Sequence, residues 1–215
     1  MNHRRKLLLL AGLPALAPLG GCITIDLAEP GETLLQYRWH DDGPMPEPRE
    51  QPLVEALLLQ PVPGAAMADT TGIAYTRGDH AFAYYQYASW TERPLRVLPR
   101  LLQRRLEARG TAGASTLLGD QQRADWLLTL AIDELHHDVS TPPGSARLAL
   151  TAELFQRRER RRVAWQRFEQ NVPLVRADAA AAVDGLSTAL TRTLDALLPW
   201  LEDALLHAAP RSTAR

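Results

Sequence analysis

Residues of the kinds that bind metal ions gather in one short stretch, Asp133-Glu134-Leu135-His136-His137-Asp138. If the preceding strand continues this far, Glu134, His136 and Asp138 share one face and offer zinc an imidazole and two carboxylates. The other interpretation is a polar strand end that runs into the Pro142-Pro143 turn. We favour the second interpretation, because the sequence supplies no distant partner at a metal-ligand spacing. We therefore predict no metal site.

Candidate nucleophiles are equally scarce. The sequence has no Gly-x-Ser-x-Gly elbow, and Ser115 and Ser145 stand among small residues and proline, as loop serines do. A glycine-rich phosphate-binding loop is also missing. The single cysteine, Cys22, closes an amino-terminal targeting segment and is predicted to carry a lipid, so its thiol is not a candidate nucleophile. These observations predict a protein that is not an enzyme, with no catalytic residues and no cofactor.

Cys22 closes a short targeting segment. Arg4, Arg5 and Lys6 precede an apolar run from Leu7 to Ala17, which has the order of a secretory signal and is too short to span a bilayer. The stretch Leu19-Gly20-Gly21-Cys22 resembles a bacterial lipobox, in which the thiol is acylated and the chain is cut just before it. We therefore predict a signal peptide over 1–21 and a lipid on Cys22. The alternative is an ordinary signal-peptidase site near Ala15-Leu16-Ala17, with Cys22 as a free thiol.

Composition limits the remaining classes of function. The whole chain has a formal net charge of −1, and loss of the leader with its three basic residues makes it −4, which argues against binding to nucleic acid. Removing residues 1–21 from the 215-residue chain leaves 194, enough for one domain with a proper core. We expect a tether over 22–32, a single domain over 33–207 and a disordered tail over 208–215.

Alternating apolar residues predict a set of strands. The expected strands cover 33–39, 53–60, 126–132, 147–154 and 163–172, together with a hairpin formed by 72–76 and 81–88. The last three strands are joined by turns and form an antiparallel meander. The segment from Asp41 to Pro52 is rich in proline and is predicted to be a loop.

Two leucine stripes predict helices. Leu95, Leu98, Leu102 and Leu106 follow helical spacing, and Gly110 ends that helix. A longer stripe runs from Val183 through Leu186, Leu190, Leu194, Leu197 and Leu201 to Leu205, and Pro199 is expected to bend or divide it. The order of elements predicts an α+β fold, with a mainly antiparallel β-sheet and both amphipathic helices packed on one face.

Two surface features are candidate binding sites. Aromatic residues concentrate in the predicted hairpin, where Tyr75, Tyr84, Tyr85, Tyr87 and Trp90 form either a partner-binding or apolar-ligand surface or a set of structural cross-strand pairs.

The second feature is a run of arginines between two predicted strands, made of Arg157, Arg158, Arg160, Arg161 and Arg162. It could contact anionic lipid head groups or an acidic partner, or it could be a solvated turn that protects the sheet edge.

A resemblance to a known family begins with Gly72-Ile73-Ala74-Tyr75, with Tyr84-Tyr85-Gln86-Tyr87-Ala88-Ser89-Trp90 and Pro94, and with the helix that follows. The family that these residues resemble is the auxiliary lipoproteins of bacterial ABC-type lipid transport systems, which include the paraquat-inducible protein C group. The resemblance covers most of the mature sequence. It continues through 126–135, 147–155, 165–173 and the closing helix that ends at Trp200-Leu201. The loop 41–52 and the arginine run are not features of the family that we can match.

This resemblance implies a periplasmic accessory protein held by its lipid in the outer membrane. Ile23 stands where inner-membrane lipoproteins commonly have aspartate, which agrees with outer-membrane sorting. The implied partners are a substrate-binding protein of the mammalian-cell-entry type, a permease and an ATPase, and a homo-oligomer is left open. The alternatives are a lipoprotein activator of a cell-wall synthase or of lipopolysaccharide insertion, and a periplasmic hydrolase or metal enzyme that would use Glu134 and His136.

Overall fold

The computed structural model describes residues 33–78, 81–120 and 123–208. The predicted signal peptide, Cys22 and the tether therefore lie outside the described residues, as do Asp79 and His80 of the hairpin turn and all of the predicted tail except Ala208. From Thr33 onward the chain forms one compact unit with a single hydrophobic core.

The described residues of this unit form eight strands, two α-helices and one short 3-10 helix. In chain order these are β1 (Leu35–Tyr37), β2 (Val54–Pro61), η1 (Ala66–Asp69), β3 (Gly72–Thr76), β4 (Phe82–Trp90), α1 (Pro94–Arg109), β5 (Ala112–Leu117), β6 (Trp126–Asp138), β7 (Ser145–Gln156), β8 (Arg161–Pro173) and α2 (Ala179–Ala208). The fold is α+β, as the sequence predicts.

Strand β6 is the centre of the sheet. One edge of β6 pairs with β7 in antiparallel orientation, and β7 pairs in the same way with β8, so the predicted meander is confirmed. The other edge pairs in parallel with β2 near the start of β6 and with β3 near its end. The sheet is thus mixed, with its longest ladders antiparallel, and the predicted β3–β4 hairpin is confirmed.

The sequence-based expectations differ from the structure in several places, and β6 runs six residues beyond its expected end at Ile132, as far as Asp138. Strand β1 is shorter than expected, and Trp39 beyond it lies in the core, where its indole N–H donates to the carbonyl of Leu186 at 3.1 Å. Strand β5 was not predicted, because its run of small residues has no apolar alternation. Helix α2 is not divided at Pro199, since its packing against β7 and β8 outweighs the loss of one backbone hydrogen bond.

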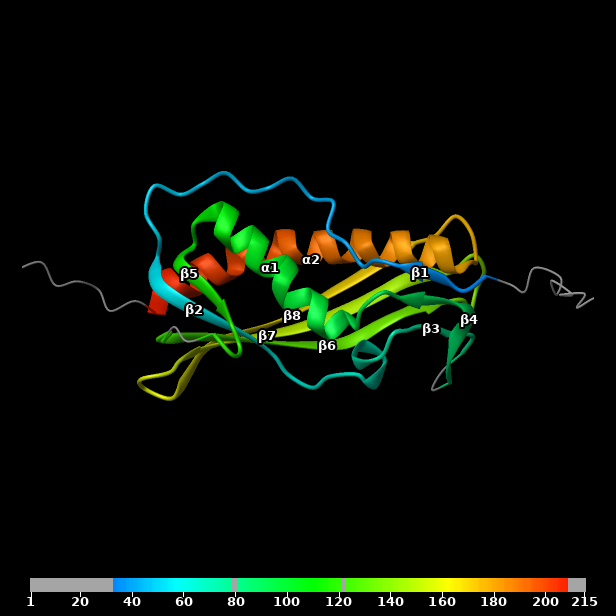
Figure 1. Cartoon of the computed structure of the whole chain (residues 1–215), viewed down its shortest axis with the longest axis horizontal. Helices are drawn as coiled ribbons and strands as arrows, with labels where there is room; N and C mark the ends of the chain where they lie inside the picture. Colours follow the sequence, from blue (N-terminus) through cyan, green and yellow to red (C-terminus); the bar gives the residue numbers. More distant parts are fainter. Residues whose placement is uncertain (1–32, 79–80, 121–122, 209–215) are drawn as a thin grey trace, which may run out of the picture. The chain divides into compact units, whose positions relative to one another are not determined.

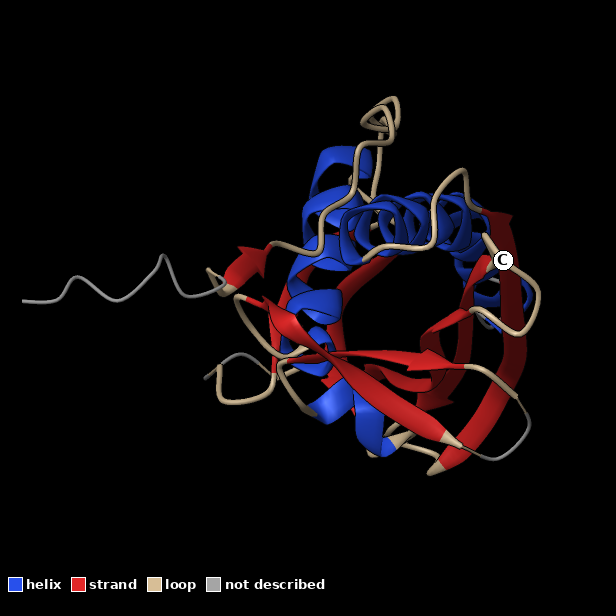
Figure 2. Cartoon of the chain, turned by 90° about the vertical axis from the view of Figure 1, so that its right-hand side faces the viewer, coloured by secondary structure: helices blue, strands red, loops and turns tan. Residues whose placement is uncertain are grey.

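Both helices lie on the same face of the sheet, as Figure 1 shows. In the perpendicular view of Figure 2 the strands curve below and beside the helices. Leu98, Leu102 and Leu106 of α1 are fully buried, and Gly110 ends the helix with a φ of 70°. The predicted loop passes over the helices in Figure 1, and Asp41 and Arg49 attach it to them through ion pairs.

Candidate functional site

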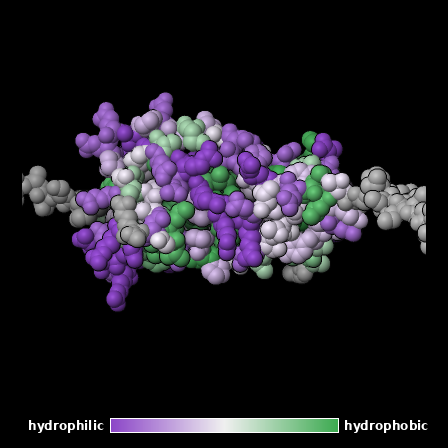
Figure 3. Space-filling model, in the orientation of Figure 1, coloured by the Kyte–Doolittle hydropathy of each residue, from purple (hydrophilic) through white to green (hydrophobic). Residues whose placement is uncertain are grey.

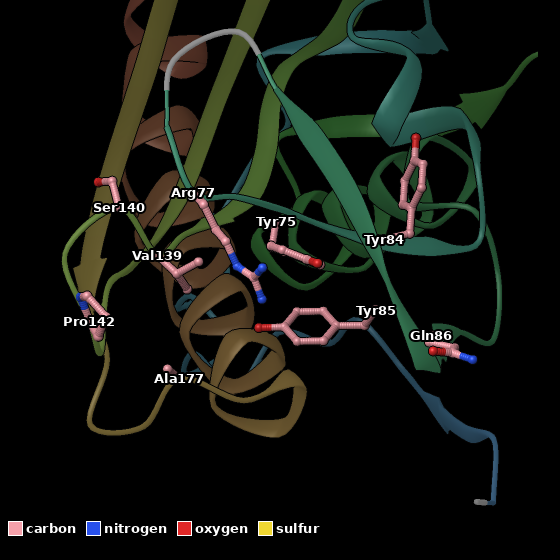
Figure 4. Close-up of a pocket in the computed structure, with 9 residues that line it drawn as sticks. All are labelled: Tyr75, Arg77, Tyr84, Tyr85, Gln86, Val139, Ser140, Pro142 and Ala177. Carbon is pink, nitrogen blue, oxygen red and sulfur yellow. The ribbon is translucent and has the colours of Figure 1, made fainter.

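The β3–β4 hairpin forms one wall of a pocket of about 620 Å³. The pocket is lined by Tyr75, Arg77, Tyr84, Tyr85, Gln86, Val139, Ser140, Pro142 and Ala177. The rings of Tyr75 and Tyr85 pack with their centroids 5.0 Å apart, and the Arg77 guanidinium lies 5.3 Å from the Tyr75 centroid. In Figure 4 these three side chains point toward one another, whereas Tyr84 and Gln86 point away from them. The pocket thus combines aromatic walls with one cation.

A buried histidine fixes the orientation of Tyr85. The side chain of His137 is fully buried, and its Nε2 lies 2.9 Å from the carbonyl oxygen of Pro143, so Nε2 carries the proton. The other ring nitrogen, Nδ1, then accepts the hydrogen bond of the Tyr85 hydroxyl at 2.7 Å. Burial, with a further contribution from Asp178, raises the pKa of Tyr85 from its ordinary value of 10 to about 12. The phenol is protonated near neutral pH, as this bond requires. The sequence did not predict the role of His137, because its only distinguishing feature in the sequence is that it follows His136.

The aromatic residues singled out from the sequence do not all reach the surface. Tyr84 and Tyr87 are 49% and 44% exposed, while Tyr75 and Tyr85 are partly buried in the pocket wall. Trp90 is only 2% exposed and packs against Trp39 with a ring separation of 6.4 Å. Trp90 is therefore a core residue, and it does not belong to the partner-binding surface in which the sequence analysis places it. Strand alternation pointed to this, since Trp90 shares its face with buried Ala88.

The arginine run covers the turn between β7 and β8 and the first two residues of β8, and carboxylates neutralise part of its charge. Arg158 pairs with Asp125 at 2.9 Å, and Arg162 pairs with Glu153. Arg161 pairs with Glu159 at 3.2 Å, and Arg157 donates to the carbonyl of Ala124 at 2.7 Å. Arg160 has no ion pair among the described residues and adopts a φ of 53°. The turn keeps a positive excess, with five guanidinium groups facing three carboxylates.

The two candidate surfaces lie at opposite ends of β6. The first residue of β6, Trp126, is paired with Gln156 beside the arginine turn. The last residue, Asp138, is paired with Thr76 of the aromatic hairpin. Thirteen strand residues at about 3.3 Å each separate the two ends by about 40 Å. In Figure 3 hydrophilic side chains gather and protrude at the end with the β7–β8 turn. The two surfaces are therefore separate along this axis.

Glu134 and Asp138 have polar partners, whereas the buried Nδ1 of His136 has none among the described residues. Glu134 accepts a hydrogen bond from Arg167 at 3.2 Å, and the Asp138 carboxylate accepts one from the backbone N–H of Ser140 at 3.0 Å. The His136 ring packs edge-on against Phe82, with centroids 5.1 Å apart. Among the described residues, no group of three or more His, Cys, Asp and Glu side chains is placed to hold a metal ion.

Comparison of the sequence with family models identifies the class of protein. Residues 37–197 match the model of the ABC-type transport auxiliary lipoprotein component, which is most of the chain. The chain therefore belongs to this family of membrane-anchored envelope proteins. In the described part, neither helix is both long and apolar enough to cross a bilayer.

Solved structures agree with the fold. A protein of the DUF330 family from Xanthomonas campestris, XCC0632, superposes with a TM-score of 0.69 at 21% identity, covering 80% of this chain and 98% of that protein. An uncharacterised protein superposes with a TM-score of 0.59 at 13% identity, covering 79% of this chain and 99% of that one. At these identities the likeness concerns the fold alone. A search of curated proteins gives no significant match.

Proposed function

We propose that this protein is an outer-membrane lipoprotein, anchored through Cys22 on the periplasmic face, that serves as a docking component of an intermembrane lipid transport system. Its partners are a mammalian-cell-entry-type substrate-binding protein and, through it, a permease and an ATPase. Its role is non-catalytic and needs no cofactor. Family membership and the lipobox motif support this assignment.

One structural observation carries the docking role: the two candidate surfaces lie at opposite ends of one body. A protein that links a membrane to other machinery needs a contact surface away from its anchor. Chain order places Thr33, which follows the tether, next to β1 and the aromatic hairpin. The β7–β8 turn lies at the far end, about 40 Å along the sheet. This turn is the surface that we assign to the transport partner, with its arginines facing an acidic patch.

Site-specific crosslinking in cells tests the proposal. A photoreactive amino acid replaces Arg160 at the far end or, as a matched control, the exposed Arg96 on α1. We expect the mammalian-cell-entry-type protein to be the main adduct at position 160 and to be depleted at position 96. Adducts with a cell-wall synthase or with lipopolysaccharide-insertion proteins at position 160 would assign the chain to a different envelope machine and reject the proposal.

The aromatic hairpin is the other surface to which the sequence assigns a partner protein. The same method tests this assignment with the photoreactive group in place of Tyr84 or Tyr87, which are both exposed. A transport protein captured there and not at position 160 would place the docking site at the hairpin end. Because this end lies next to the tether, we do not assign the transport partner to it.

A further inference from the structure

Large apolar side chains are exposed mainly at one end of the described body. Six of the ten exposed large hydrophobic residues lie at the end that carries β1 and the β3–β4 hairpin, and they are between 44% and 85% exposed. They are Leu34, Leu35, Phe82, Tyr84, Tyr87 and Val175.

Backbone pairing brings these residues to one end although they come from three parts of the chain. Leu35 of β1 pairs with Ala88 of β4, which places Leu34 and Leu35 beside the tyrosines. The backbone N–H of Leu174 donates to the carbonyl of Gly144 at 3.0 Å, so Val175 lies next to the turn that follows β6. Figure 1 shows β1, β3 and β4 together at this end.

The charged residues at this end include both signs. The Arg77 side chain is exposed beside Tyr75, and Arg176 pairs with Asp178 at 2.7 Å. Asp138 accepts the N–H of Ser140, and the exposed Asp184 lies near Arg176. Tyrosine, leucine and arginine side chains are the types that rest at the boundary between lipid head groups and acyl chains.

The length of the tether favours the anchor's own membrane over a protein as the occupant. Eleven residue steps separate Cys22 from Thr33. A flexible chain of this length has a root-mean-square span of roughly 20 Å and a limit of about 40 Å. The end that carries Thr33 is therefore held close to the bilayer at a high effective concentration, while the arginine turn lies about 40 Å further along β6.

We propose that the exposed apolar end of the domain, formed by β1, the β3–β4 hairpin and the loop that contains Val175, rests on the bilayer that holds the Cys22 lipid. This inference depends on the lipid anchor of the proposed function, but not on the identity of the transport partner. It orients the domain upright, with the arginine turn pointing away from that membrane.

Depth-dependent quenching on vesicles tests this orientation. The full-length acylated protein is reconstituted into vesicles of phosphatidylethanolamine and phosphatidylglycerol that contain a lipid with a quenching nitroxide on its acyl chain. Because the lipid blocks the sulfur of Cys22, a thiol-reactive fluorophore labels only an introduced cysteine. Tyr84→Cys and Leu35→Cys report on the apolar end, and Arg160→Cys is the matched control at an exposed position of the far end. Near-ultraviolet circular dichroism checks that each variant is folded.

We expect quenching at positions 84 and 35 to exceed that at position 160 several-fold. Equal quenching at both ends, or stronger quenching at position 160, in a protein that floats with the vesicles would overturn this inference alone. A protein that does not float with the vesicles would overturn the anchor and this inference together.

Discussion

Arg105 of α1 binds Asp41 of the proline-rich loop through two parallel hydrogen bonds, each 2.6 Å long. Their side chains are only 2% and 4% exposed. A further hydrogen bond from the Thr191 hydroxyl to Asp41, at 2.8 Å, extends the contact to α2. The loop is therefore fixed to both helices, and this ion pair is inside the protein rather than on its surface.

Removing the Asp41 carboxylate should lower the free energy of unfolding by about 3 kcal/mol or more, because Arg105 is left buried without its main partner. Asp195 also pairs with Arg105, but its side chain is 51% exposed, so Asp195→Asn should cost less than about 1 kcal/mol. Urea unfolding of Asp41→Ala and Asp195→Asn, followed by tryptophan fluorescence, measures both values. Equal losses of unfolding free energy in the two variants would show that burial does not determine how strongly each carboxylate stabilises the protein through Arg105.

Gly185 marks a place where α2 approaches β7 closely. A Cβ atom at this position would lie 2.3 Å from Leu174 Cδ2 and 2.8 Å from Ala146 Cβ. We expect Gly185→Ala to lower the free energy of unfolding by about 1–3 kcal/mol, even though alanine favours a helix. Gly78→Ala is the control, because nothing lies within 4 Å of a Cβ there. A stabilised Gly185→Ala variant in the same urea experiment would contradict the close packing.

Buried His136 predicts a loss of stability in mild acid. Burial lowers the pKa of His136 below its ordinary value of 6.5, with opposing contributions from Glu134 and Asp138. The unfolded chain therefore takes up a proton first, so the contribution of His136 is fully present above about pH 6.5 and is lost as the pH falls below it. His136→Phe keeps a ring beside Phe82 and removes the titration. We expect the variant to lose less stability than the natural protein between pH 7 and 5, as thermal unfolding would show. If the stability of the variant and of the natural protein fell in parallel between pH 7 and 5, this prediction would be wrong.

A second loss at lower pH should follow from buried carboxylates. Burial alone would raise the pKa of Glu202, but hydrogen bonds from Arg109 and Thr111 lower it below 4.5. Its contribution is therefore present above about pH 4.5 and disappears as the pH falls through the lowered value. Glu202→Gln should flatten the stability profile below pH 4.5 and leave the His136 region unchanged. A profile unchanged below pH 4.5 would remove Glu202 from the explanation.

Replacement of Cys22, the residue that we propose to be lipidated, should release the protein from the membrane. Cys22→Ser removes the only thiol, so no acyl chain can be attached at this position. We expect the natural protein to be recovered in the outer-membrane fraction of lysed cells and the variant to be recovered in the soluble fraction. Mass spectrometry of the amino terminus provides the control for acylation. A natural protein that carries no lipid would refute the anchor.

The sequence was sufficient for elements with strong periodicity. The leucine stripe ending at Gly110 predicted α1, and alternating apolar residues predicted the meander of β6, β7 and β8. It was insufficient where contacts between distant residues decide. The small residues of β5 form no alternating pattern that predicts a strand. Tertiary packing keeps α2 continuous across Pro199.

The candidate surfaces show the same division. Residue types identified the aromatic hairpin and the arginine turn, but nothing local indicated that they lie at opposite ends of β6. Periodicity also could not reveal that His137 holds Tyr85, because that bond joins residues 52 positions apart. Long-range pairing, rather than local pattern, created the geometry on which the docking proposal depends.

Affinity purification of the acylated full-length protein from envelopes, combined with a change at the far end, tests the docking role most directly. The variant Arg158→Glu/Arg160→Glu/Arg161→Glu reverses the charge of the turn, and Arg96→Glu is the control on α1. We predict that the natural protein and the control retain the mammalian-cell-entry-type substrate-binding protein and that the turn variant loses most of it. Failure of the natural protein to retain this partner, or equal retention by the turn variant, would contradict our account.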